Sequence, residues 1–268
     1  MRCVAARAGC ALLMLAAGLA CAGGDEAPGT APQAATSAGS QSAEDATRAV
    51  AQAAPHGEPQ AAPASATATP DKIVRSDMDF HRKRLHLRSA GSESGQAVLL
   101  LHGQAFDSAT WEQLGTLTYL AEHGLRAVAI DAPGYGKSEA VDIQREALLE
   151  ELVPALGLER PVIVAPSMGA LYAFPYAVAH PEGVAGLVPV APAGLDEWLP
   201  KLRDCAVPAL IVWGSADTVV PVARADELAA ALKNSRTLIL KGAPHPAYLE
   251  RPAEFHEALV EFARSVAR

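Results

Sequence analysis

Six short apolar runs recur between residues 97 and 240, and their alternation with helix-like stretches limits the possible folds of this chain most strongly. Continuous apolar runs of four or five residues are typical of strands that are buried on both faces, as in a parallel sheet. Strands that alternate with helices imply right-handed crossovers. We therefore expect a three-layer α/β domain, with a mostly parallel sheet between two layers of helices. The expected strands are 97–101, 127–130, 162–165, 187–190, 209–213 and 237–240, and the expected helices are 108–122, 142–156, 168–179, 222–232 and 252–266.

The folded domain is expected to span residues 71–268. Its first part, residues 73–80 and 83–88, alternates in a way that predicts an antiparallel pair of strands. Residues 22–70 are rich in Ala, Pro, Ser and Thr and contain no Leu, Ile, Met, Phe, Tyr or Trp. Such a segment cannot bury enough apolar surface to offset its ordering entropy, so we interpret it as a disordered linker.

Residues 1–22 have the pattern of a secretory signal peptide. Two arginines precede an apolar run, residues 9–20, which is too short to span a bilayer as a helix. Residues 18–21, Gly-Leu-Ala-Cys, resemble a bacterial lipoprotein box, in which Cys21 is lipidated and becomes the mature N-terminus. Ordinary cleavage after residue 22 and an uncleaved anchor are the alternatives. We expect an exported protein of the periplasm or cell envelope, held at a membrane through this lipid anchor only.

The net charge argues against nucleic-acid binding, and the spacing of the histidines argues against a metal site. The formal net charge of −8 argues against a nucleic-acid-binding protein, which usually presents a basic face. Cys205 is the one cysteine of the expected domain, and we interpret it as a small buried apolar residue. No metal site is expected, because five histidines of the expected domain lack the spacing of metal ligands. We interpret these five as surface or capping residues. They are His81, His86, His123, His180 and His256.

A serine follows the third of the six apolar runs, at the point where a strand would turn sharply into a helix. This is the setting of a nucleophile elbow, in which the turn lifts the serine Oγ above the sheet. The residues two before and two after the serine must be small, and here they are Ala165 and Gly169. Ser167 is therefore a candidate nucleophile, and the alternative is a serine that caps a helix.

An acid and a base follow later strands in the order that such a nucleophile requires. Asp217 follows the strand at 209–213, and His245 follows the last strand. Both would lie at the carboxyl edge of the sheet, where α/β proteins place their chemistry. His245 would take the proton of Ser167, and Asp217 would orient the imidazole. Taken singly, the two residues could equally be a loop histidine and a turn-forming aspartate.

An acyl-transfer serine also needs donors for the oxyanion that develops on the substrate. The backbone N–H of Met168, next to the nucleophile, is one candidate. The backbone N–H of Gln104, in the loop after the strand at 97–101, is the other. His102 in the same loop is expected to brace the loop rather than to act as a base.

The same residues resemble the α/β-hydrolase superfamily. The shared features are the His-Gly at residues 102–103, the Asp-x-Pro-Gly-x-Gly-x-Ser at 131–138, the elbow, and the Gly-Ala-Pro-His at 242–245. Several longer stretches within residues 72–268 are most similar to the small abhydrolase-domain protein fourteen family. The resemblance implies Ser167, Asp217 and His245 as nucleophile, acid and base, with no cofactor. It also implies a possible acyl acceptor, coenzyme A, for acetyl groups removed from lysine.

The sequence thus predicts a monomeric serine hydrolase that cleaves short acyl esters or amides through an acyl-enzyme. About 14 residues separate Gly194 from Ala209, which is too few for a sizeable cap domain, so the site should be open. Water is the expected acceptor, because the post-strand loops carry only scattered cations. The alternatives are an acyl transferase with a thiol acceptor and a catalytically silent hydrolase fold that serves as a binding module.

Overall fold

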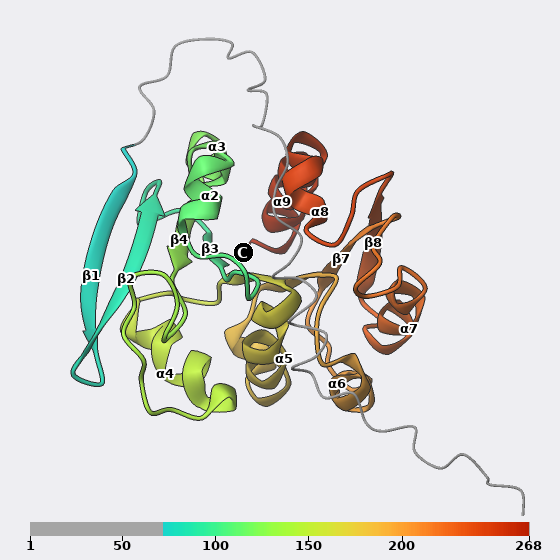
Figure 1. The fold of residues 1–268 in the computed structure, drawn as a ribbon, viewed down its shortest axis with the longest axis horizontal. Helices are drawn as coiled ribbons and strands as arrows, with labels where there is room; N and C mark the ends of the chain where they lie inside the picture. Colours follow the sequence, from blue (N-terminus) through green and yellow to red (C-terminus); the bar gives the residue numbers. More distant parts are fainter. Residues whose placement is uncertain (1–71, 268) are drawn as a thin grey trace, which may run out of the picture. The chain divides into compact units, whose positions relative to one another are not determined.

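A computed structural model describes residues 72–267 of the chain. Within these residues, eight strands form one sheet in the order β1-β2-β4-β3-β5-β6-β7-β8 (Figure 1). The first two strands pair antiparallel with each other, and β2 pairs antiparallel with β4. All other neighbours are parallel, which confirms the mostly parallel sheet. The strands are β1 (Val74–Phe80), β2 (Lys83–Ala90), β3 (Ala97–Leu100), β4 (Arg126–Ile130), β5 (Val162–Pro166), β6 (Gly186–Val190), β7 (Ala209–Gly214) and β8 (Ser235–Leu240).

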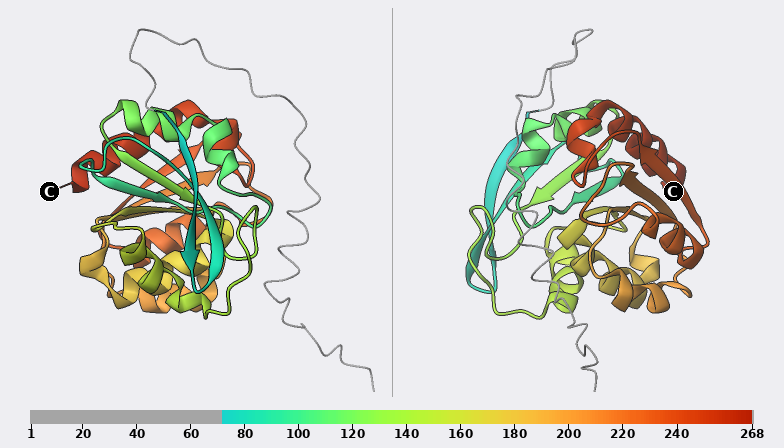
Figure 2. Two further views of the ribbon diagram at one scale, coloured as in Figure 1. Left: turned by 90° about the vertical axis from the view of Figure 1, so that its left-hand side faces the viewer. Right: turned by 45° about the vertical axis from the view of Figure 1, so that its right-hand side comes forward.

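Helices cover both faces of the sheet, as the alternating pattern predicts (Figures 1 and 2). One face carries α2 (Ala109–Gln113), α3 (Thr116–Glu122), α8 (Ala247–Glu250) and α9 (Pro252–Val266). The other carries α4 (Leu148–Ala155), α5 (Ala170–Ala179), α6 (Leu195–Leu202) and α7 (Arg224–Ala231). Three 3-10 turns complete the described elements: η1 (Arg145–Ala147), η2 (Ser167–Gly169) and η3 (Pro181–Gly183).

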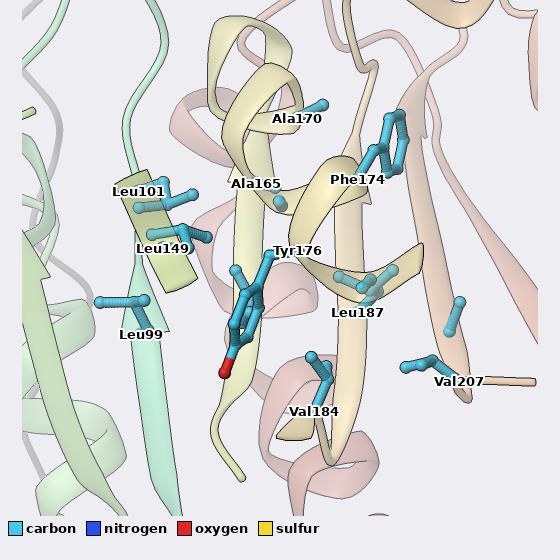
Figure 3. Packing of buried hydrophobic residues seen from close by; sticks show 14 of the residues in the cluster. Leu99, Leu101, Leu149, Ala165, Ala170, Phe174, Tyr176, Val184, Leu187 and Val207 are labelled. Carbon is cyan, nitrogen blue, oxygen red and sulfur yellow. The ribbon is translucent and has the colours of Figure 1, made fainter. Parts of the chain in front are cut away.

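Each central strand supplies side chains to both cores, which explains why its sequence is apolar throughout. In β5, Val162 and Val164 pack under α9 and its neighbours, whereas Ile163 and Ala165 pack under α4 and α5. Successive side chains of a strand point to opposite faces, so a strand with two buried faces has no polar position. Figure 3 shows the second core, with α5 packed over the sheet through Phe174 and Tyr176 among Leu99, Leu101, Leu149 and Leu187.

The helices differ from the sequence expectation in several places. The predicted helix at 108–122 is two helices, because Gly115 adopts a left-handed φ of 76° between them. The predicted helix at 142–156 becomes α-helical only at Leu148, after η1. Helices α6 and α8 have no counterpart among the predicted helices, although the prediction that no sizeable cap follows β6 is correct. Among residues 72–267, no helix is long and apolar enough to cross a membrane. The predicted leader and linker lie outside the described residues.

Candidate active site

The elbow predicted at Ser167 is a sharp turn between β5 and α5. Ser167 begins η2 directly after β5, with a left-handed φ of 44°. A non-glycine residue in this conformation is strained, and such strain is found mostly at functional sites. The helix start packs tightly on the sheet, since a Cβ on Gly169 would lie 3.1 Å from the Leu101 Cβ. A side chain at 169 would therefore crowd the turn, which agrees with the small residue there.

Asp217 and His245 meet beyond the ends of β7 and β8. The Nδ1 of His245 lies 2.9 Å from Oδ2 of Asp217, and both side chains are buried. The other carboxylate oxygen accepts hydrogen bonds from the backbone N–H groups of Val219 at 2.8 Å and Val220 at 2.9 Å. The carboxylate is thus fixed by its own loop, and it holds the imidazole with Nδ1 as the donor.

A close backbone approach aligns the two loops that carry this pair. The N–H of Ala216 donates to the carbonyl of Ala243 at 3.0 Å. A Cβ on Gly214, the last residue of β7, would lie 2.2 Å from the same carbonyl oxygen and 2.4 Å from that of Pro244. Only glycine allows the His245 loop to lie this close to β7.

Ser167 and His245 line one small cavity at the carboxyl edge of the sheet. Its volume is about 10 Å³, which is room for one water-sized group. The Nε2 of His245 is buried and has no hydrogen-bond partner among residues 72–267. No hydrogen bond joins it to Ser167 in the described part, and such bonds often tighten only when substrate binds. The cavity is lined by Gly103, Gln104, Phe106, Pro166, Ser167, Val190, His245, Pro246 and Tyr248.

The two residues expected to supply the oxyanion donors are near Ser167 in different ways. Gln104 lines the cavity, and Met168 follows Ser167 in η2. His102 braces the Gln104 loop, as predicted: its Nδ1–H donates to the Gly103 carbonyl at 2.8 Å, and its Nε2 accepts from the Ala132 N–H at 3.0 Å. Burial lowers the pKa of His102, so the ring stays neutral and keeps one donor and one acceptor.

A buried carboxylate that none of the sequence predictions involved ties the Gln104 loop to the loop after β4. One oxygen of Asp131 accepts hydrogen bonds from the backbone N–H of Ser108, at 2.8 Å, and from the Ser108 hydroxyl. The other accepts from the Lys137 N–H at 2.7 Å. A Cβ on Gly136 would lie 2.2 Å from this oxygen. The Asp-x-Pro-Gly-x-Gly-x-Ser motif therefore positions the loop that carries Gln104.

The structure also corrects part of the histidine interpretation. His86 and His256 are buried rather than surface residues. His86 bonds Asp77 across the β1–β2 hairpin at 2.6 Å, and His256 bonds the Thr116 hydroxyl at 2.8 Å. Burial lowers the pKa of His256 to about 4. Among residues 72–267, no three His, Cys, Asp or Glu side chains are grouped to hold a metal. Cys205 is buried and free, as predicted.

Comparison with known proteins agrees with this geometry. Residues 98–199 match the model of the alpha/beta hydrolase family. The chain is 41% identical over 194 residues to the human protein named "Putative protein-lysine deacylase ABHD14B", a match that covers 68% of this chain and 91% of that protein. This chain belongs to the α/β-hydrolase family. ABHD14A of Danio rerio is also 41% identical, over 191 residues that cover 68% of this chain and 70% of the relative.

Solved structures support the same assignment. A CIB-like hydrolase from Thermoplasma acidophilum is similar, with a TM-score of 0.69 and 28% identity over 73% of this chain and 99% of that one. A bacterial membrane phospholipase A has a TM-score of 0.66 at 20% identity, over 72% of this chain and 86% of that one, and it supports the fold alone. The family resemblance in the sequence motifs is thereby confirmed, with ABHD14A and ABHD14B as homologues of this hydrolase-family chain.

Proposed function

We propose that this protein is a serine hydrolase that removes short acyl groups from esters or amides. Ser167 is the nucleophile, His245 the base and Asp217 the residue that orients the base. One observation carries the proposal. His245 is held through Nδ1 by a buried carboxylate, its Nε2 has no partner among residues 72–267, and the residue lines the same cavity as Ser167. A base oriented from one side and free on the other is the arrangement that activates a serine.

The proposed reaction proceeds through an acyl-enzyme. Ser167 Oγ attacks the acyl carbonyl carbon while His245 Nε2 takes the Oγ proton, and the carbonyl oxygen becomes an oxyanion beside the N–H groups of Met168 and Gln104. The C–O or C–N bond then breaks, and the leaving alkoxide or amine receives the proton from His245. A water molecule next gives a proton to His245 and attacks the acyl-enzyme, which releases the carboxylic acid and returns the proton to Ser167.

The cavity volume supports a short acyl group. The space of about 10 Å³ beside Ser167 has room for about one water-sized group, which favours a short acyl group. The leaving group has more freedom, because only α6 lies in the connection from β6 to β7, and within residues 72–267 no cap domain is inserted there. The names of the ABHD14B relatives favour one amide class, acylated lysine side chains.

Turnover of matched substrates tests the proposal. We expect hydrolysis of an acetyl ester and of an acetyl-lysine peptide, with water as the acceptor. Addition of coenzyme A should leave both rates unchanged, and a large increase with acetyl-coenzyme A as product would make the transferase alternative correct. Asp217→Asn should lower kcat about 10⁴-fold, because the amide favours the wrong His245 tautomer. Asp226→Asn, at an exposed position of α7, is the matched control. A wild-type protein without turnover on either substrate would contradict the proposal.

We also propose that the hydrolase is attached to a membrane outside the cytoplasm by a lipid anchor at Cys21. This proposal rests on the sequence pattern of residues 1–22 alone. Cys21→Ser should move active protein from the membrane fraction to the soluble fraction, because the acyl chains supply the membrane affinity. Wild-type protein that is wholly soluble, with an unmodified mature N-terminus at residue 23, would favour ordinary signal cleavage instead.

A further inference from the structure

The segment that follows β6 is hydrogen-bonded to the turn that carries Ser167. The backbone N–H of Ala193 donates to the Ser167 carbonyl at 3.0 Å. Two residues earlier, the N–H of Ala191 donates to the Val212 carbonyl of β7, also at 3.0 Å. The segment is thus attached to β7 on one side and to the turn after β5 on the other. The proton transfers of the proposed reaction do not involve the Ser167 carbonyl, so they leave its hydrogen bond unexplained.

Ala191 holds this segment in a strained backbone conformation. Ser167 and Ala191 directly follow two neighbouring parallel strands, β5 and β6, and both have a left-handed φ, of 44° and 41°. Alanine rarely adopts such a φ. Strain of this kind persists only where the surrounding structure imposes it, and it is concentrated at functional sites. The conformation of Ala191 therefore indicates that the segment after β6 is part of the site.

The carbonyl that accepts this hydrogen bond belongs to the same peptide unit as an expected oxyanion donor. The Ser167 C=O and the Met168 N–H lie in one planar trans peptide, so they point in opposite directions. A contact that fixes the direction of the carbonyl therefore fixes the direction of the N–H. Met168 lies in the first turn of η2, where N–H groups have no partner inside the helix and are left for another acceptor.

The order of the strands gives the direction in which this N–H points. In the sheet, β5 lies between β3 and β6. Ala193 follows β6, so the Ser167 carbonyl that it binds points to the β6 side. The Met168 N–H then points to the β3 side, where the loop after β3 carries Gln104 and lines the cavity with Ser167. Both expected oxyanion donors are thereby on the same side of the nucleophile.

We propose that Ala193 is a positioning residue of the oxyanion hole, whose backbone N–H orients the Met168 N–H by binding the Ser167 carbonyl. This inference rests on the proposed serine-hydrolase function. A hydrogen bond to the carbonyl also polarises the peptide, which makes its N–H a stronger donor. The charge on the oxyanion grows in the transition state, so a well-oriented donor acts on kcat more than on KM.

An amide-to-ester replacement tests the proposal, because it removes one backbone N–H and keeps the side chain. Lactic acid in place of Ala193 keeps the methyl group and puts an ester oxygen where the N–H was. The matched control is lactic acid in place of Ala185, whose N–H donates to the Pro161 carbonyl at 3.1 Å. Ala185 and Pro161 directly precede β6 and β5, so this bond joins the same two strands at the opposite edge of the sheet.

The two esters should differ in turnover of an acetyl ester. We expect kcat of the Ala193 ester to be at least about fivefold below that of the Ala185 ester, with KM within about threefold of wild type. The loss is smaller than the 10²–10³-fold typical of a deleted oxyanion donor, because the Met168 N–H is misdirected rather than removed. Urea unfolding should find both esters folded.

A measurement on the wild-type protein gives a second test that needs no replacement. A trifluoromethyl ketone that adds to Ser167 puts a stable oxyanion beside the Met168 N–H. The oxyanion polarises the shared peptide and so strengthens the hydrogen bond from Ala193. In the NMR spectrum, the amide proton of Ala193 should therefore move downfield on addition of the ketone, whereas that of Ala185 should stay in place. An Ala193 signal that stays in place or moves upfield overturns the inference.

The outcomes separate this inference from the proposed function. An Ala193 ester whose kcat lies less than fivefold below that of the Ala185 ester overturns the inference, even if KM rises. The proposed function stands in that case if a fluorophosphonate still labels Ser167 and Ser167→Ala is inactive. A wild-type enzyme that neither turns over the acetyl ester nor reacts with the fluorophosphonate overturns the proposed function itself.

Discussion

The Asp131 carboxylate accepts a hydrogen bond of 2.8 Å from the backbone N–H of Ser108, which links the loops after β4 and β3. Its second oxygen accepts from the Lys137 N–H, and the side chain is almost fully buried. Asp131→Asn replaces one of these acceptors with an NH₂ donor. We expect the free energy of unfolding to fall by about 1–3 kcal/mol, the cost of a buried donor left unpaired. Urea unfolding measures this, with the exposed Asp142→Asn as control. A loss below about 0.5 kcal/mol, at the level of an ordinary surface substitution, would show that Asp131 does not hold the loops together.

The same carboxylate predicts a loss of stability in acid. Burial alone would raise the pKa of Asp131, but hydrogen bonds from Lys137 and Ser108 outweigh it and hold the pKa below its ordinary value of 3.8. A lowered pKa in the folded state gives a stability contribution that is full above pH 3.8 and is lost as the pH falls below it. Unfolding curves of wild type should show this acid loss, and Asp131→Asn should lack that part of it. Identical acid profiles would contradict the prediction.

Gly214→Ala is expected to separate His245 from Asp217. The new Cβ would lie 2.2 Å from the Ala243 carbonyl oxygen, so the loop that carries His245 must shift. We expect a fall in kcat of at least 10²-fold, because a displacement of about 1 Å is enough for that. Gly242→Ala, in the same loop but with open space around its Cβ, is a control for loop substitution, although its φ of 76° adds strain. A Gly214→Ala enzyme with wild-type kcat would mean that this contact does not set the alignment.

Acyl-chain preference depends on the walls of the cavity. Phe106 is a half-buried loop residue that lines it, and Phe106→Ala should enlarge the space beside Ser167. We expect kcat/KM for butanoyl and hexanoyl esters to rise relative to the acetyl ester. A chain-length series on both enzymes measures the ratio. An unchanged ratio would show that Phe106 does not limit the acyl group.

The sequence was sufficient for the parallel sheet because strands such as β5 are apolar on both faces, and few other structures bury such runs. It also indicated Ser167, Asp217 and His245, because each follows the carboxyl end of a predicted strand and they occur in the order that a serine hydrolase requires. The Asp131 carboxylate carried no such signal, since its bonds to Ser108 and Lys137 form only where the loops after β3 and β4 meet. Helices α6 and α8 were missed. Pro200 lies inside α6, where proline usually breaks a helix, and α8 is only four residues long. The leader, linker and Cys21 stay predictions from sequence.

The central claim is that Ser167 is the nucleophile, and one experiment tests it directly. Wild-type protein is treated with a fluorophosphonate, the modified residue is located by mass spectrometry, and turnover of an acetyl ester is compared with that of Ser167→Ala. The account predicts one phosphonate on Ser167 and a loss of turnover of up to about 10⁶-fold in the variant, because the three residues act as a unit. Labelling at another residue, or near wild-type turnover by a folded Ser167→Ala protein, would contradict it.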